Sequence, residues 1–246
     1  MPEKTFQGGI HPQYFKELSR NSPVKVLSVP DQVIIPLRQH TGGPCRATVG
    51  AGDSVKVGTL IGDSPKFISA PIHSSVSGTV KAIRAADHPV LEKCNSVVID
   101  SDGRDEMEAP AWTVAKEIGD LQGDAIRNII RGAGIVGLGG AGFPTHAKLL
   151  PPKSKPIDTF ILNGVECEPY LTCDERIMIE RPGDVLGGVL LMMKVIGVEK
   201  GIIAIEDNKP EAIEAMTAAL DDIRHTAHGS FDKAQDSSRA KSRDDI

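Results

Sequence analysis

A glycine-rich stretch at residues 132–150, "GAGIVGLGGAGFPTHAKLL", constrains the fold of this chain more than any other feature. It contains the pattern G-x-G-x-x-G twice in overlap, which is the spacing of dinucleotide-binding Rossmann turns. A Rossmann turn needs a strand directly before the glycines and a helix after them. Here the preceding "DAIRNIIRGAG" has helical spacing, and Pro144, which follows, is tolerated only in the first turn of a helix. The sequence therefore predicts a helix, a glycine loop and a short helix, which is not the Rossmann order.

The glycines can bind a phosphate without that topology. Residues that lack side chains let several backbone N–H groups turn toward one anion. A helix that begins at Pro144 or Thr145 would add its positive end, and Lys148 lies close enough in sequence to reach a phosphate. The alternative is that the glycines only allow the two flanking helices to pack closely.

A second polar cluster follows in "LNGVECEPYLTCDER", residues 162–176. An apolar run of strand type ends at Asn163, and the turn after it carries Glu166 and Glu168. Ligands of α/β sheets bind at the carboxyl ends of strands. Two neighbouring carboxylates are costly unless they are solvated or functional. The motif therefore predicts a binding site, with solvated surface acids and an Asp174–Arg176 ion pair as the alternative.

Composition and charge exclude several classes of function. The formal net charge of -5 leaves no basic footprint for nucleic acid. No apolar run reaches the ~20 residues of a membrane-spanning helix, and the N-terminus has no apolar signal-peptide core. The four cysteines form no C-x-x-C pair, so no metal site is predicted, although Cys167 and Cys173 flank the acidic motif. We expect a cytoplasmic protein without a direct membrane span, which a partner could still hold at a membrane.

The remaining patterns divide the chain into four parts. Residues 1–32 look like a lead-in segment with at most one short helix. Residues 33–103 contain short runs typical of strands, namely "VIIPLRQH", "SVKVGTLIG", "KFISAP", "SGTVKAI" and "NSVVID". Between residues 113 and 228, helix-type and strand-type runs alternate, which favours an α/β domain, with one helix expected over "DERIMIERPGDVLGGVLLMMKVIGVEKG". Residues 229–246 almost lack apolar side chains and are predicted to be a disordered tail.

The order "GDSVKVGTLIG" and "ISAPIHSSVSGTVKAI" resembles the two halves of a barrel-sandwich hybrid, the fold of lipoyl and biotinyl carrier domains. Those carriers present a modifiable lysine on a hairpin shortly before the second half. Lys66 lies in the corresponding region but without the Met-Lys context of the carriers. We therefore expect an unmodified β module that serves in docking.

The two core motifs together, "GIVGLGGAGFPTHAKL" and "ILNGVECEPYLTCDER", resemble the RnfC family, the C subunits of the Rnf electron-transport complex. The segments "GGIHP", "PLRQH" and "SAPIHSSVSGTVKAI" match the N-terminal part of that family. More distantly, the core motifs are similar to the FMN- and NADH-binding subunit of respiratory complex I. The resemblance implies an α/β fold class, in which a β-rich barrel-sandwich hybrid module precedes a complex-I-flavoprotein-like α/β domain. It also implies electron transfer from NADH through FMN to iron–sulfur clusters. The partners would be the other subunits of a membrane-bound Rnf-type complex, with this chain peripheral on the cytoplasmic face of the membrane.

The same resemblance implies which residues bind the cofactors. The FMN contacts of the glycine loop fall on Gly137, Gly139, Gly140, Gly142, Phe143 and Lys148. The flavin and nicotinamide pocket is implied at Asn163, and Glu166 and Glu168 take the catalytic positions. His146 departs from the complex I motif, which has a glycine there.

Missing segments limit this expectation. Rnf C subunits carry ferredoxin-type C-x-x-C-x-x-C-x-x-x-C-P motifs for 4Fe-4S clusters, and this sequence contains none. The segment that completes the flavin pocket in the relatives is also missing after "EAMTAAL". We therefore expect a shortened subunit with an incomplete α/β domain. The alternatives are a non-catalytic docking fragment of the complex and an electron-transfer relative of the cobalamin or proline reductase type.

Overall fold

The computed structural model describes residues 12–109, 121–138, 140–152 and 154–240, with side chains described up to residue 225. By its internal contacts the chain forms two compact units, which are described separately. The sandwich unit comprises Val26–Ile157 with Lys194–Gly197. The α/β unit comprises Met1–Lys25, Asp158–Met193 and Val198–Ile246.

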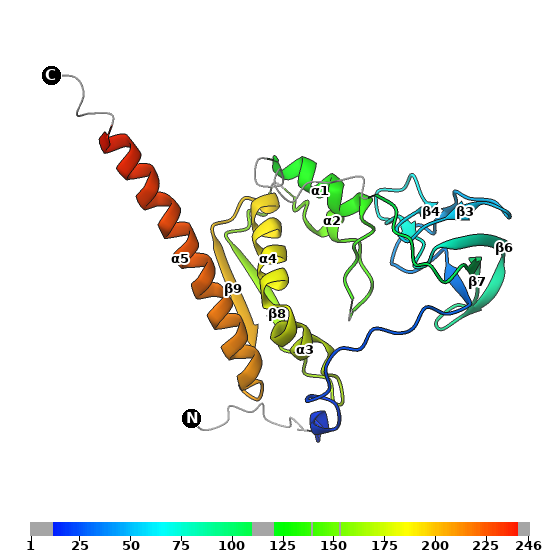
Figure 1. The fold of residues 1–246 in the computed structure, drawn as a ribbon, viewed down its shortest axis with the longest axis horizontal. Coiled ribbons are helices and arrows are strands. Elements are labelled where there is room, and N and C mark those ends of the chain that lie inside the picture. The colour runs from blue at the N-terminus through cyan, green and yellow to red at the C-terminus, as the bar shows by residue number, and fades with distance from the viewer. Residues whose placement is uncertain (1–11, 110–120, 139, 153, 241–246) are drawn as a thin grey trace. The chain divides into compact units, whose positions relative to one another are not determined.

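The sandwich unit contains two antiparallel sheets. The larger sheet has the order β1-β7-β6-β3, and the smaller one has the order β2-β4-β5. The long hairpin of β6 and β7 dominates the larger sheet (Figure 1). The strand bounds are β1 Gln32–Pro36, β2 Arg46–Ala47, β3 Ser54–Val55, β4 Leu60–Asp63, β5 Ile72–His73, β6 Gly78–His88 and β7 Glu92–Ser101.

Side chains from both sheets build one core. On β7, Val97 and Ile99 are fully buried, and Val80 of β6 is 1% exposed. Ile61 of β4 and Ile72 of β5 join the same cluster from the smaller sheet. Residues of two sheets that bury one shared apolar layer make a sandwich, which agrees with the β module expected from the short alternating runs.

The segment "KFISAP" is not a strand, although its composition predicted one. Its backbone and side chains form hydrogen bonds with a neighbouring turn instead of pairing with another strand. The Ala70 N–H donates to His40 Nε2 at 3.1 Å, and the Ser69 hydroxyl donates to the Gly43 carbonyl at 2.9 Å. Pro71 has no N–H to offer a partner strand. Strand β5 therefore begins only at Ile72.

Replacing Gly78 by alanine should destabilise the sandwich unit strongly. Gly78 has φ +153, and a Cβ atom there would lie 2.1 Å from the Asp100 carbonyl oxygen, which belongs to the paired strand. Backbone cannot move aside as a side chain can, so we expect a loss of about 2–4 kcal/mol in the free energy of unfolding. Gly52→Ala is the control, because φ there is +95 but nothing lies within 4 Å. Denaturant unfolding of both variants measures the difference, and equal losses would contradict this explanation.

The glycine segment folds with the sandwich unit. Helix α1 spans Gly123–Gly132 and buries Ile126 and Ile130, as its helical spacing predicted. Helix α2, Thr145–Lys148, follows the glycines and begins directly after Pro144. The predicted order of helix, glycine loop and short helix is confirmed. By internal contacts, the glycine segment belongs to the same unit as the strands of the sandwich. The two units therefore divide the chain at other residues than the domains expected at 33–103 and 113–228.

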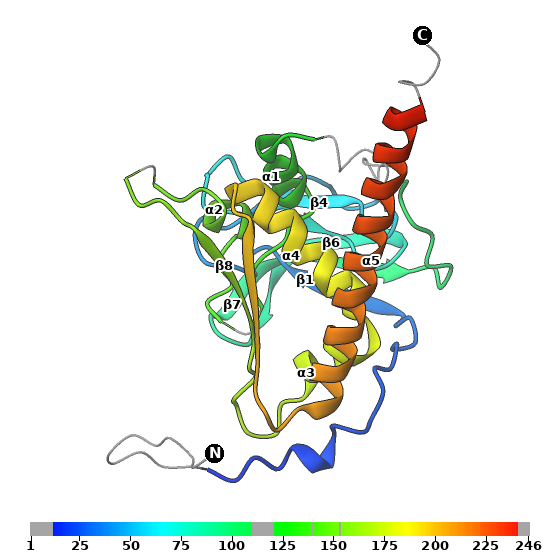
Figure 2. The same cartoon turned by 90° about the vertical axis from the view of Figure 1, so that its left-hand side faces the viewer.

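The α/β unit is built on two parallel strands, β8 Thr159–Gly164 and β9 Lys200–Ile205. Gly164 pairs with Ile205, so the turns that follow the two strands start at the same edge of the sheet. Helices α4 and α5 lie beside the strands in both views (Figures 1 and 2). The remaining elements are η1 Lys16–Leu18, α3 Cys173–Glu180, α4 Pro182–Ile196 and α5 Pro210–Ala240.

Two helix boundaries differ from the sequence prediction. The single helix expected after the acidic motif is divided at Arg181, because Pro182 cannot donate a backbone hydrogen bond to α3 and instead opens α4. Helix α5 extends to Ala240 and so overlaps residues 229–240 of the predicted disordered tail, while residues 241–246 lie outside the described part. Within the described residues, no helix combines the length and apolar character that a membrane crossing requires.

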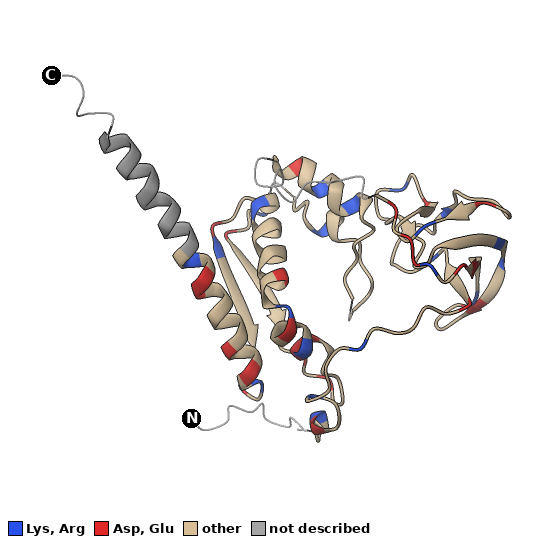
Figure 3. Cartoon of the chain, in the orientation of Figure 1, with Lys and Arg blue, Asp and Glu red and all other residues tan. Residues whose placement is uncertain are grey.

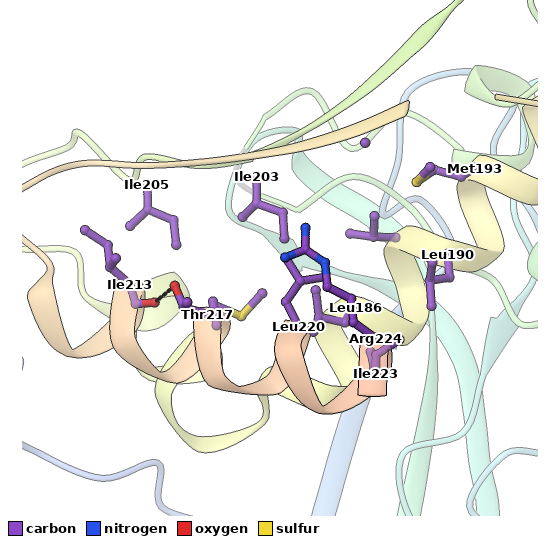
Figure 4. Close-up of a pocket in the computed structure, with 13 residues that line it drawn as sticks. Leu186, Leu190, Met193, Ile203, Ile205, Ile213, Thr217, Leu220, Ile223 and Arg224 are labelled. Atoms are coloured by element: carbon purple, nitrogen blue, oxygen red, sulfur yellow. Dashed lines mark hydrogen bonds between the residues drawn. The ribbon is translucent and has the colours of Figure 1, made fainter. Parts of the chain in front are cut away.

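An apolar groove of about 500 Å³ lies between α4, β9 and α5 (Figure 4). Its few polar groups include the Thr217 hydroxyl, which donates to the Ile213 carbonyl one turn earlier, and the Arg224 guanidinium, 3.5 Å from Asp221. Most of α4 is free of charged side chains (Figure 3). A groove with so few polar partners does not suit a nucleotide, whose phosphates and hydroxyls require them.

Candidate functional site

The glycine loop is closed at its base by backbone hydrogen bonds. The Gly137 N–H donates to the Phe143 carbonyl at 2.9 Å, and the Thr145 N–H donates to the Ile135 carbonyl at 3.0 Å. The N–H of Gly137 is therefore used inside the loop and is not free to bind a phosphate. Gly139 lies outside the described residues.

Two glycines of the segment serve close packing against the sandwich. Gly134 has φ +70, and a Cβ atom there would lie 2.4 Å from the Pro71 carbonyl oxygen. Gly142 has φ +60, and its Cβ would lie 3.3 Å from the Gln39 carbonyl oxygen. The Thr41 N–H also donates to the Gly142 carbonyl at 3.1 Å. Glycine is thus required at these positions for packing, although the neighbour is the β module and not the second helix.

The opposite side of the loop is open. Gly140 is exposed, and nothing lies within 4 Å of the position that a Cβ atom would take. The Lys148 ammonium nitrogen lies 2.7 Å from the corresponding position of Gly137, so a positive charge stands beside the loop. Backbone without side chains next to an ammonium group is the chemistry that a phosphate-bearing cofactor needs. These residues fit the phosphate of FMN. The sequence also suggested that the positive end of the α2 dipole would stabilise the phosphate, but α2 is a single turn and its dipole contributes little.

A cavity of about 1050 Å³ adjoins the loop within the sandwich unit. Residues 136–138 and 140–142 line one side, and the segment from Arg38 to Gly42 lines another, with His73 and His88 nearby. Its volume is sufficient for a nucleotide-sized ligand. Sequence reasoning did not single out Arg38 as a site residue, although the quoted segment "PLRQH" contained it.

His146 belongs to the packing of this loop. It is 2% exposed, its Nε2 lies 2.9 Å from the Phe67 carbonyl oxygen, and its ring stands edge-on to Phe67 at 5.3 Å. Its Nδ1 is buried without a hydrogen-bond partner among the described residues. Burial lowers the pKa of the imidazole, and the positive charges of Arg131 and Arg127 act in the same direction. The side chain that replaces a glycine of the complex I motif is therefore a neutral packing element.

The acidic turn lies after β8 in the α/β unit. Asn163 is exposed, and its Oδ1 accepts a hydrogen bond from the Val165 N–H at 3.1 Å, so its amide nitrogen points elsewhere. Glu168 is exposed. Glu166 is buried, with φ +48, in the left-handed region that few non-glycine residues adopt.

The carboxylate of Glu166 caps helix α3. Its Oε1 accepts from the Asp174 N–H at 2.7 Å, and its Oε2 accepts from the Glu175 N–H at 3.1 Å. These N–H groups belong to the first turn of α3, where a negative charge is stabilising. The Cys173 thiol also donates to Oε1 at 3.3 Å. The two acidic positions thus differ, since Glu166 is occupied by the protein's own backbone and Glu168 is accessible.

Charges around this turn repel one another. Desolvation raises the pKa of Asp174, and the nearby Glu166 and Glu168 raise it further. Desolvation likewise raises the pKa of the Cys173 thiol, again reinforced by Glu166. Arg176 does not pair with Asp174 as the sequence suggested, because its Nε donates to Glu180 at 2.9 Å.

The acidic turn also brings possible metal ligands together. Atoms of Glu166, Cys173 and Asp174 lie within 4.8 Å of one another. Both oxygens of the buried carboxylate already accept hydrogen bonds from helix N–H groups. The carboxylate of this cluster is thus engaged by the protein's own backbone.

Comparison with known proteins identifies both halves of the chain. Residues 4–104 match the family described as the RnfC barrel sandwich hybrid domain, and residues 130–237 match the Nuo51 FMN-binding domain. Over these two domains the chain belongs to the RnfC family. The second match contains both the glycine loop and the acidic turn. Family and fold class, each expected from the sequence, are therefore confirmed.

Curated relatives agree with this membership. The C subunit of the proton-translocating ferredoxin:NAD(+) oxidoreductase complex of Clostridium ljungdahlii is 48% identical over 218 residues, which cover 89% of this chain and 48% of the relative. The C subunit of the Na(+)-translocating complex of Acetobacterium woodii is 46% identical, with 88% of this chain and 48% of the relative covered. The C subunit of an ion-translocating oxidoreductase complex of Haemophilus influenzae is 39% identical over 87% of this chain and 33% of the relative. The chain thus spans about half or less of the length of these relatives.

Proposed function

We propose that the chain is an electron-transfer subunit of a ferredoxin:NAD⁺ oxidoreductase complex, and that it takes electrons from NADH through FMN. The open side of the glycine loop carries this proposal. Gly140 offers bare backbone there, and the Lys148 ammonium stands beside Gly137 of the same loop, inside the segment that matches an FMN-binding domain. When bound, FMN supplies the acceptance of a hydride and the release of single electrons, which no side chain of the chain can do.

The glycine loop would hold the phosphate end of FMN. Gly139, Gly140 and Lys148 are proposed as direct contacts, and Gly137 shapes the loop through its bond to the Phe143 carbonyl. Gly142 supports the loop from the side of the sandwich. The positive charge of Lys148 beside the loop would attract the negatively charged phosphate.

The acidic turn would contribute to binding the flavin ring, the nicotinamide or the ribose hydroxyls. Asn163 and Glu168 are proposed to face the ligand, because both side chains are exposed. A carboxylate at Glu168 can accept hydrogen bonds from ligand hydroxyl or ring N–H groups. For Glu166 we propose a structural role as the cap of α3 in place of the catalytic role first expected, since both its oxygens are already engaged.

The partners are proposed from the relatives' names, and the location is proposed from the family resemblance. The relatives are subunits of ion-translocating ferredoxin:NAD⁺ oxidoreductase complexes. We propose that this chain binds other subunits of such a complex on the cytoplasmic face of a membrane. The 4Fe-4S clusters that would accept electrons from FMN need ligands outside this sequence, which lacks the ferredoxin-type cysteine spacing.

A titration with FMN tests the proposal. Quenching of flavin fluorescence on addition of the purified, folded chain should show one binding site per chain. A parallel titration with riboflavin, which lacks the phosphate, should show binding at least about tenfold weaker, since the loop recognises the phosphate. Absence of FMN binding by a folded chain would support the alternative of a non-catalytic docking module.

A further inference from the structure

Lys16 is a buried lysine whose partners are all backbone carbonyls of the acidic turn. It is 3% exposed although it lies in the lead-in segment. Its Nζ donates to the carbonyl oxygens of Glu166 at 2.7 Å, Glu168 at 3.0 Å and Leu171 at 2.6 Å. An ammonium group has three N–H donors, so all of them are used.

The turn needs such a partner. Glu166 and Tyr170 adopt left-handed backbone conformations, with φ +48 and +68, and three carbonyls converge on one point. Converging carbonyl oxygens repel one another, and buried acceptors without a donor are costly. The ammonium supplies both the opposite charge and the missing donors. The conformation of residues 166–171 therefore depends on a side chain about 150 residues earlier in the sequence.

Residues on both sides of Lys16 also contact the acidic turn. The Tyr170 N–H donates to the Tyr14 carbonyl at 2.7 Å, and the rings of Phe15 and Tyr170 stack at 5.0 Å. The Ser19 hydroxyl lies 2.9 Å from that of Thr172. Charged residues gather around η1 and α3 (Figure 3). We call residues 14–20 the strap.

The strap also reaches the start of the second turn at the same sheet edge. Arg20 donates to the Glu175 carboxylate at 2.6 Å and to the Asn208 carbonyl at 2.7 Å. The ion pair joins Arg20 to α3, and the hydrogen bond to Asn208 joins it to the turn after β9; neither contact uses the three carbonyls that Lys16 binds. Arg20 and Lys16 thus hold different parts of the edge, so their effects can be separated by mutation.

We infer that Lys16 is a positioning residue for the nicotinamide- and flavin-binding turn. It fixes the backbone of Glu166 and Glu168 so that the exposed Glu168 carboxylate is presented to the ligand in one orientation. The inference about ligand binding rests on the proposed function, whereas the inference about the backbone does not. No signal near the acidic motif in the sequence points to this residue.

The test compares Lys16→Met with Arg20→Met in the full chain. Methionine keeps the length and burial of lysine but cannot donate, so the three carbonyls lose their partner. Amide hydrogen exchange over residues 166–171 should become about 10- to 100-fold faster in the Lys16 variant, the factor expected for loss of a charged hydrogen bond. The dissociation constant for NADH of the FMN-loaded chain should rise by about the same factor. Arg20→Met breaks an ion pair in which Glu175 is buried and Arg20 is partly exposed. It should lower the unfolding temperature, yet change NADH affinity less than about threefold.

A second variant keeps the inference testable if the methionine variant does not fold. Lys16→Arg retains the charge, but a planar guanidinium cannot direct three protons toward carbonyls around one point. Exchange in the turn should then be several-fold faster than in the wild type, and wild-type exchange would overturn the inference. Loosening of the turn without any change in NADH affinity would overturn the positioning role. A wild-type chain that binds neither FMN nor NADH would instead refute the proposed function, and the exchange result would still decide whether Lys16 fixes the turn.

Discussion

Replacing Gly140 by valine should abolish retention of FMN while leaving the stability of the chain unchanged. Space is open around this position, and its backbone does not require glycine, so a side chain causes no clash within the protein. A cofactor phosphate against the same backbone would meet the new methyl groups. We expect the affinity for FMN to fall at least about 100-fold, which a steric cost near 3 kcal/mol produces. Fluorescence titration and thermal unfolding measure the two quantities.

Two further glycine variants serve as controls for this result. Gly187→Val places the same side chain on α4, again with nothing within 4 Å, and should leave both FMN affinity and stability unchanged. Gly142→Val meets the Gln39 carbonyl at φ +60, so it should lower the free energy of unfolding by about 1–3 kcal/mol. Unchanged FMN affinity in the Gly140 variant would mean that the glycine loop is not the cofactor loop.

Replacing Glu166 and Glu168 by glutamine, one at a time, should separate stability from ligand binding. Glu166→Gln puts an amide NH₂ group against the α3 N–H donors and removes the negative charge that caps the helix. We expect the free energy of unfolding to fall by about 1–3 kcal/mol, with NADH-dependent reduction of bound FMN retained in the folded fraction. Glu168→Gln changes an exposed side chain. Its unfolding temperature should stay the same while the dissociation constant for NADH rises about tenfold.

The reverse pattern would return Glu166 to a catalytic role. If Glu166→Gln unfolded at the wild-type temperature but reduced FMN slowly, its capping bonds would not be its main function. If Glu168→Gln bound NADH as the wild type does, the Glu168 carboxylate would be an ordinary solvated surface group, which is the alternative that the sequence left open.

Sequence patterns correctly predicted the helices and strands whose conformation is decided by residues close together in the sequence. Helix α1 follows from the spacing of Ile126 and Ile130, and β8 and β9 follow from short apolar runs that end at turns. The short helix α2 after the glycine loop follows from the position of Pro144. In these cases the residues that decide the conformation lie within one or two turns of each other.

Sequence reasoning missed features that depend on distant partners. The segment "KFISAP" has strand composition, but His40 and Gly43 take up its hydrogen bonds. Glu166 stands in a motif that suggests catalysis, and only the approach of α3 shows that its carboxylate is a helix cap. Lys16 is separated by 150 residues from the Glu166 carbonyl that it binds. Such contacts leave no periodic pattern in one sequence.

The glycine loop has one feature that its sequence predicted and one that depends on distant segments. Its spacing predicted backbone exposed to an anion, which Gly140 and the nearby Lys148 support as a proposal. The same spacing could not distinguish Gly142, which packs against Gln39, from glycines on the open side. Roles within a glycine loop therefore require the positions of neighbouring segments, and here those neighbours come from the β module.

Anaerobic addition of NADH to the FMN-loaded chain tests the central claim most directly. The visible absorbance band of oxidised flavin should disappear with one equivalent of NADH, and it should persist in the Gly140→Val chain supplied with the same FMN. A wild-type band that remains unchanged, in a chain that is folded and has bound FMN, would contradict electron entry from NADH at this site.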